Sequence, residues 1–192
     1  MRPDRGECTQ MHMVDDPPSE APLPPGRGNL REIVMGAQDN LTTVLAVVLG
    51  VAIGSGEVRT VALAGLAAGI AEAISMAGVL YTATRAERDL AESEGRSVNG
   101  TMNEPIVAGA ITFGAAMVAA AIPLAPFAVL PLHLAAIGAA VVSVGALFGL
   151  GFWTGGVTRK SRWWAGVRFV AIGGLAALGS ALVGAALHSH EI

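Results

Sequence analysis

Acidic side chains inside apolar stretches are the residues of this chain that could do chemistry. Glu72 lies midway between Arg59 and Arg85, in an almost wholly apolar run from residue 58 to residue 84. If this run crosses a bilayer as a helix, the carboxyl group lies roughly 20 Å from either arginine, near the membrane midplane. A charged group at that depth costs on the order of 3 kcal/mol, which indicates a function or a partner for it.

Asp39 interrupts an earlier apolar stretch in a similar way. In one interpretation Asp39 is a helix N-cap at the membrane surface, and the bilayer begins at Leu41. The segment 41–53 alone would be too short to span a bilayer, whereas a span that starts at Ile33 has the required length and submerges Asp39. The submerged position is therefore favoured.

Met76 could join the two carboxylates as a metal ligand. It follows Glu72 by four residues, so the two side chains share one face of a helix. Met76 is nine residues from Arg85, or roughly 14 Å, which predicts that it lies level with Asp39 and that Glu72 lies about one turn deeper. Two hard oxygen ligands and a soft thioether suit a borderline divalent transition metal better than calcium or magnesium. The alternative, a methionine that only packs or faces lipid, stays open.

The composition predicts an integral membrane protein whose helices hold these residues. The chain has 192 residues, of which 53% are hydrophobic and 14% are charged, and its mean hydropathy is +0.57. The formal net charge of −3 gives no case for nucleic-acid binding. The single cysteine, Cys8, cannot form a disulfide within the chain. No Ser-His-Asp pattern, H-E-x-x-H motif or phosphate loop indicates an enzyme.

Five apolar stretches predict five transmembrane helices in an all-α domain. Residues 1–29 contain six prolines and no long apolar run, so we expect a disordered cytoplasmic leader before a transporter domain at 30–192. A tight turn at Gly54–Glu57 predicts an antiparallel hairpin of the first two spans, and Pro123, Pro126 and Pro131 separate the third from the fourth. The predicted spans are 33–53, 58–84, 106–124, 127–152 and 169–187.

The basic residues predict a cytoplasmic amino terminus and an outward carboxyl terminus. In that orientation the outer segments hold only Arg59, and the inner segments hold eleven basic residues: Arg2, Arg5, Arg27, Arg31, Arg85, Arg88, Arg96, Arg159, Lys160, Arg162 and Arg168. Trp153, Trp163 and Trp164 then fall at the inner interface, as an aromatic belt. Glycine pairs four residues apart, at 50 and 54, 65 and 69, and 145 and 149, predict close helix packing or dimerisation.

Two motifs resemble those of the vacuolar iron transporter family. Residues 31–41, R-E-I-V-M-G-A-Q-D-N-L, are similar to the family's opening signature R-E-I-V-x-G-A-x-D-G-L. Residues 71–77, A-E-A-I-S-M-A, followed by Tyr81 and by residues 85–89, resemble the motif of its second helix. With the five-span layout, the resemblance extends over roughly residues 30–187.

The resemblance implies a homodimer of five-helix protomers that exports cytosolic ferrous iron, and sometimes manganese, in exchange for protons. The pathway would run along the dimer interface, lined by the first helix. The metal is cargo, and no resident cofactor is implied. The family's membrane ligands correspond to Asp39, Glu72 and Met76. Glu32 at the inner mouth also matches the motif, although it could be a surface charge near a helix N-terminus.

Three departures from the family pattern leave a second function open. Asn40 replaces the usual glycine, and Leu80 stands where many members carry an acidic residue. The 20-residue connection from Arg85 to Glu104 is too short for the glutamate-rich cytosolic domain that many members carry. The nodulin-like branch of the family also lacks this domain. The alternative is a membrane module that binds metal or assembles with partners without transport. For localisation, we expect a bacterial plasma membrane first and a vacuole second.

Overall fold

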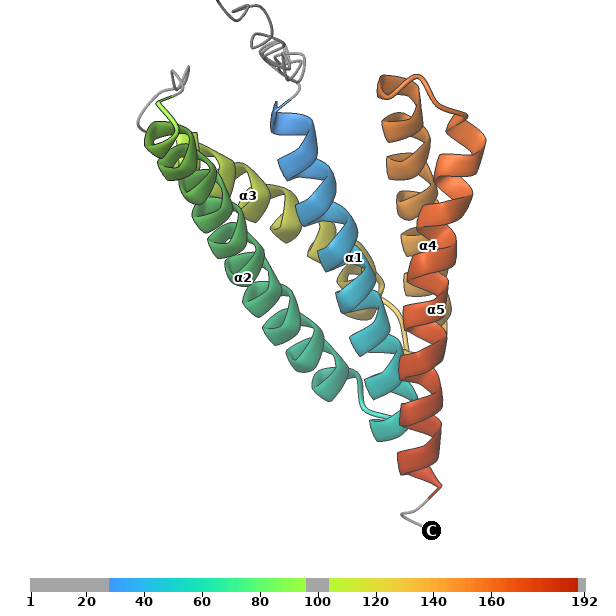
Figure 1. The fold of residues 1–192 in the computed structure, drawn as a ribbon. Helices are drawn as coiled ribbons and strands as arrows, with labels where there is room; N and C mark the ends of the chain where they lie inside the picture. The colour runs from blue at the N-terminus through green and yellow to red at the C-terminus, as the bar shows by residue number, and fades with distance from the viewer. Residues whose placement is uncertain (1–27, 96–103, 190–192) are drawn as a thin grey trace, which may run out of the picture.

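The computed structural model describes residues 28–95 and 104–189, and the part it describes is built from helices. Five long helices follow one another (Figure 1): α1 (Gly28–Ser55), α2 (Val58–Ser93), α3 (Glu104–Leu124), α4 (Leu132–Val157) and α5 (Arg162–His188). A short 3-10 helix, η1 (Ala125–Ala128), connects α3 to α4. Each of the five long helices is long and apolar enough to cross a membrane. The predicted all-α, five-span architecture of the protomer is therefore confirmed.

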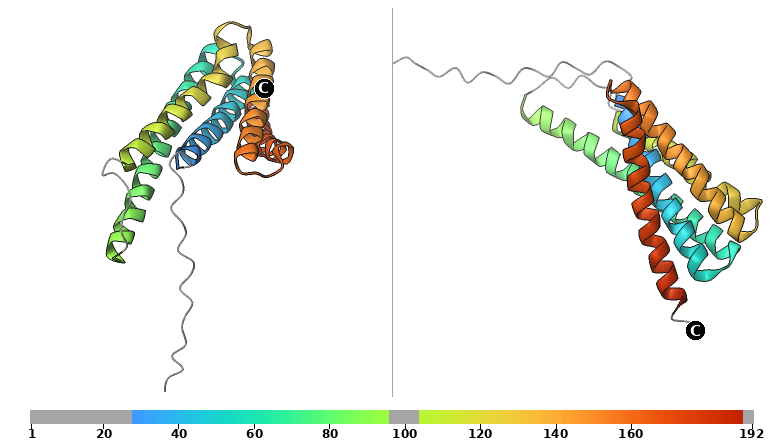
Figure 2. Two further views of the ribbon diagram at one scale, coloured as in Figure 1. Left: turned by 90° about the horizontal axis from the view of Figure 1, so that it is seen from above. Right: turned by 90° about the vertical axis from the view of Figure 1, so that its right-hand side faces the viewer.

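α1 is the central helix, because it packs against each of the other four. α2 and α3 pair on one side of it and α4 and α5 on the other, as Figures 1 and 2 show. Side chains three or four residues apart line the inner face of α1, and Leu41, Val44, Leu45 and Val48 are each at most 2% exposed. Any residue on α1 is therefore placed by contacts with both helix pairs.

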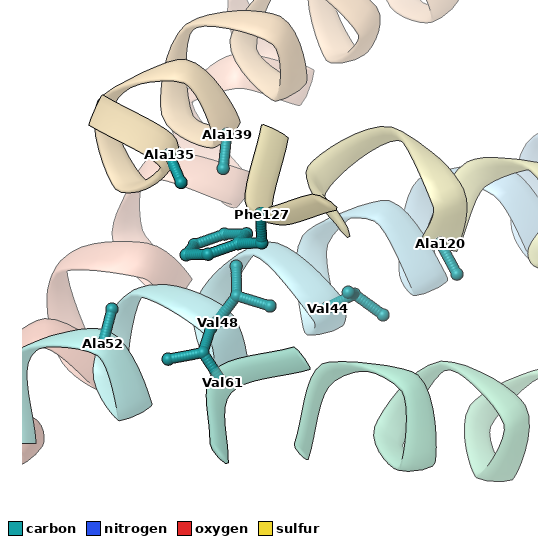
Figure 3. Packing of buried hydrophobic residues seen from close by; sticks show 8 residues of the cluster. All are labelled: Val44, Val48, Ala52, Val61, Ala120, Phe127, Ala135 and Ala139. Atoms are coloured by element: carbon teal, nitrogen blue, oxygen red, sulfur yellow. The ribbon is translucent and has the colours of Figure 1, made fainter. Parts of the chain in front are cut away.

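Phe127 closes the core where α3 turns into α4. Its ring lies in an apolar cluster drawn from four helices and η1 (Figure 3), which also contains Val44, Val48, Ala52, Val61, Ala120, Ala135 and Ala139. We predicted the fourth span from residue 127, but α4 begins later, after Pro131. Proline lacks an N–H and favours helix starts, so Pro126 lies in the first turn of η1 and Pro131 precedes α4.

Several helices extend beyond the predicted spans. α2 continues past residue 84 to Ser93, and α5 begins before residue 169, at Arg162. Hydropathy marks only the apolar part of a helix, whereas residues such as alanine, glutamate and arginine prolong it into water. The predicted leader, 1–29, lies outside the described residues except for Gly28 and Asn29, with which α1 begins.

Two of the three glycine pairs serve packing within the protomer. Gly65 and Gly69 lie on the buried face of α2, against α1 and α3, and Gly50 contacts α5. A Cβ added at Gly69 would lie 2.9 Å from the Cβ of Ala120, so this crossing leaves no room for a side chain. Gly145 and Gly149 of α4 are exposed and would accommodate a Cβ freely.

Candidate metal centre

The carboxyl groups of Asp39 and Glu72 meet where α1 passes α2. The two side chains lie close enough to interact with each other. Asp39 is exposed on the protomer, and Glu72 is partly buried. Two ionised carboxylates at this range repel each other, and a proton on one of them or a shared cation would relieve that repulsion. One proton would neutralise one of the two groups, whereas a divalent cation would balance both.

The hairpin between α1 and α2 brings this pair together. Its turn contains Gly56, whose φ of 67° lies in the left-handed region that glycine tolerates. Asp39 and Glu72 are almost equally far from Gly56 along the chain, so two helices of equal rise bring them to the same level. The depth estimate made from the flanking arginines is wrong by about one turn, because it placed Met76, and not Glu72, level with Asp39. Charged residues flank a span at variable distances, whereas the turn fixes the register.

Asp39 is an interior residue of α1. The helix begins at Gly28, well before Asp39, so the N-cap interpretation is wrong. The part of α1 with the length and hydropathy of a membrane span runs from Glu32 to Ser55 and includes Asp39. The carboxyl pair therefore belongs to the membrane-spanning part of the bundle.

The other two predicted ligands flank the pair without forming a closed cage. Met76 is partly buried on the turn of α2 that follows Glu72. Glu32 lies two turns before Asp39 on α1, roughly 10 Å along the axis. Its Oε2 atom is buried and has no hydrogen-bond partner among the described residues. Within 28–95 and 104–189, no three histidine, cysteine, aspartate or glutamate side chains gather as a metal site.

Asn40 is a polar residue of this region whose position the sequence did not reveal. Its side chain is fully buried, and its Nδ2 donates hydrogen bonds to the carbonyl oxygens of Gly69 and Ala116, each at 3.0 Å. These acceptors belong to α2 and α3, so one amide joins three helices. The sequence signal that could have pointed to Asn40 was its replacement of the glycine usual at this place in the opening signature.

Leu80 belongs to the packing face of α2. It is 1% exposed and lies on the same buried face as Gly65, Gly69 and Ala73. The side chain that stands where many family members carry an acid therefore contributes to contacts within the protomer.

Three of the acidic residues in the connection predicted after the second span, Glu87, Asp89 and Glu92, lie instead on the extension of α2, whereas Glu94 follows α2 and Glu104 begins α3. Arg85 and Asp89 form an ion pair at 3.9 Å with side chains that are 63% and 64% exposed. Such solvated pairs contribute little to stability. Because α2 continues through the first half of the predicted loop, only residues 94–103 connect α2 to α3. The predicted loop length is therefore wrong.

Comparisons with known proteins agree with the two motifs. The model of the VIT family matches residues 30–99 and 95–185, and the two segments meet in the connection between α2 and α3. No curated protein matches the chain. The matched segments cover well over half of the chain and include the carboxyl pair, Met76 and Glu32. The chain therefore belongs to the VIT, or vacuolar iron transporter, family of membrane metal-ion transporters.

Proposed function

We propose that this chain is a homodimeric transporter that carries a divalent transition metal out of the cytosol in exchange for protons. Ferrous iron is the first candidate cargo and manganese the second. The observation that carries the proposal is the close approach of Asp39 and Glu72 in the parts of α1 and α2 that are apolar enough to span a membrane. Membership of the VIT family supports the metal cargo.

The pair has the chemistry that an exchange of metal for proton needs. A divalent cation would balance two carboxylates, whereas a proton on one of them would relieve their repulsion when the metal is absent. Binding of the metal expels that proton, and release of the metal lets a proton return. Met76, one turn along α2, adds a soft ligand that favours transition metals and holds them weakly enough to be released. Glu32, nearer the start of α1, would receive the ion first.

The exposure of Asp39 supports a dimer. A carboxyl group that faced lipid from the spanning part of α1 would be costly, so the exposed side of the pair needs a cover. A second protomer, related by a two-fold axis, would present the same pair and enclose an aqueous path between the two copies. The dimer would supply four carboxyl groups and two thioethers to one pathway.

The distribution of basic residues supports the direction of transport. α2 ends near the start of α1, and the α4–α5 turn lies at the same end of the bundle (Figure 1). This end carries Arg85 and Arg88 on α2 and Arg159, Lys160 and Arg162 at the α4–α5 turn, whereas Arg59 lies at the other. We assign the first end to the cytosol. The carboxyl terminus would then lie outside, and the host membrane we propose is a bacterial plasma membrane.

Flux into proteoliposomes tests the proposal. The purified protein is reconstituted with a metal-sensitive dye and, in parallel vesicles, a pH-sensitive dye in the lumen, and Mn²⁺ or Fe²⁺ under reducing conditions is added outside. An acidic lumen should accelerate metal entry, and metal entry should carry protons out. Liposomes without protein are the control. Metal entry that ignores the pH gradient would contradict the exchange, and binding without entry would contradict transport.

A membrane module that binds metal, or assembles with partners, without transport is the second candidate. Leu80 favours it, because a buried leucine stands where many relatives carry an acid that could handle metal. This alternative predicts saturable binding of Mn²⁺ by the purified protein and no flux in the same vesicles.

A further inference from the structure

Asn40 is the buried polar side chain that bridges helices next to the carboxyl pair. The fully buried polar residues in the described part of the chain are Asn40, Thr112 and Ser143. The hydroxyl of Thr112 donates within its own helix, to the carbonyl of Ala108, and the Ser143 hydroxyl has no partner among the described residues. Only the Asn40 amide, among these three, hydrogen-bonds to other helices.

The surroundings of Asn40 are shaped for this contact. Both acceptors are main-chain carbonyls, which have a second lone pair beyond the one used inside a helix. Gly69 has no side chain and Ala116 has a small, fully buried one, so the amide can reach both backbones. A glycine at position 40, the residue usual in the family signature, could form neither bond.

The contact lies directly beside the candidate ligands on both helices. Asn40 follows Asp39 on α1, and Gly69 precedes Glu72 by three residues on α2, within one helical turn. A bond between Asn40 and Gly69 therefore fixes how α1 and α2 slide and rotate relative to each other at the pair. The bond to Ala116 extends the constraint to α3.

We infer that Asn40 is a positioning residue that holds Asp39 and Glu72 at a fixed separation and thereby sets which size of divalent cation the pair prefers. The inference rests on the proposed function, since it assigns the ion preference of the same site. Selectivity between cations depends on the size and rigidity of the site, and a clamp on the two helices that carry the ligands limits both. Without the clamp, the pair adapts to ions of different size.

The first measurement tests geometry without metal. Asp39→Cys and Glu72→Cys are combined in a Cys8→Ser background. A short bifunctional thiol reagent then joins the two cysteines within one chain, and the rate of this reaction is measured from the crosslinked product that has the mass of a single protomer. Asn40→Leu, which preserves volume and removes the donor, should change this rate by about threefold or more. Ser143→Ala, which removes another fully buried polar group, should leave the rate unchanged.

The second measurement tests selectivity with the native ligands in place. The Kd values of Co²⁺ and of the larger Cd²⁺ are measured by equilibrium dialysis of the purified protein. Their ratio should change by about threefold or more in Asn40→Leu and stay within about twofold of wild type in Ser143→Ala and Thr112→Val. A purely structural role would reduce the amount of active protein and leave the ratio intact.

The outcomes separate this inference from the proposed function. If Asn40→Leu does not fold, the Asn40→Ser variant is used in its place, since the serine side chain is shorter but keeps one hydrogen-bond donor. The crosslinking rate and the ratio of Kd values should then change in the same way, by smaller factors. An unchanged crosslinking rate and an unchanged ratio in a folded Asn40 variant would overturn the inference, even if the wild type transports metal. A wild type that binds metal without flux contradicts only the transport, because the crosslinking rate and the ratio can still be measured.

Discussion

The side chains of Asp39 on α1 and Glu72 on α2 lie close together in the part of the bundle that is apolar enough to cross a membrane. Glu72 is partly buried, whereas Asp39 is exposed. In the proposed function, this pair would exchange a proton for a cation that arrives from the exposed side. The following predictions test its parts separately.

Replacing the less exposed of the two carboxyl groups should abolish exchange. Glu72→Gln preserves the shape of the side chain but removes a group that can carry charge. Metal binding to the wild type should release protons and tighten as pH rises, because metal and proton compete for the carboxylates. In the variant, flux should vanish and the remaining binding should depend less on pH, with unchanged protein yield. Wild-type flux in Glu72→Gln would exclude the proposed role.

The two copies of Asp39 should lie close to each other in the membrane. With Cys8→Ser as background, Asp39→Cys should crosslink to its symmetry mate with a short bifunctional reagent and give a product of twice the protomer mass. Leu175→Cys, on α5 and 72% exposed, is the matched control and should stay monomeric. Crosslinking at position 175 and not at position 39 would place the two-fold interface on α5.

The sulfur of Met76 should distinguish soft from hard metals. Met76→Leu keeps the volume and removes the thioether, so affinity for Co²⁺ and Fe²⁺ should fall while any binding of Mg²⁺ stays unchanged. Met117→Leu, in a partly buried position of α3, is the control for loss of a methionine. An equal loss for all metals would mean that Met76 only packs beside Glu72.

The crossing of α2 at Gly69 should tolerate no side chain. Gly69→Ala places a Cβ 2.9 Å from Ala120 and 3.3 Å from Val44, so overpacking should destabilise the protein by about 1–3 kcal/mol. Gly78→Ala, on the same helix, meets nothing within 4 Å and should be neutral or slightly stabilising. Thermal unfolding in detergent measures both. Equal unfolding temperatures would show that α2 can shift at this crossing.

The sequence by itself determined the class of the protein, the number of helices and the two acidic groups inside them. Hydropathy over about 20 residues predicts a span in any fold, because a bilayer imposes a length and a composition. The motifs around Asp39 and Glu72 also sufficed to recognise the family, which the family comparison supports. Helix ends were less predictable, because helices such as α2 continue into water after the apolar residues stop.

Only the tertiary structure decided which side chains meet. The level of Asp39 against α2 depends on the hairpin register and on how small residues let the two helices cross, which no hydropathy pattern contains. The amide of Asn40 reaches carbonyls that are distant in the sequence, on helices that come together only in the packed bundle. Periodicity assigns a residue to a face of its own helix, whereas its partners follow from the packing of all the helices around it.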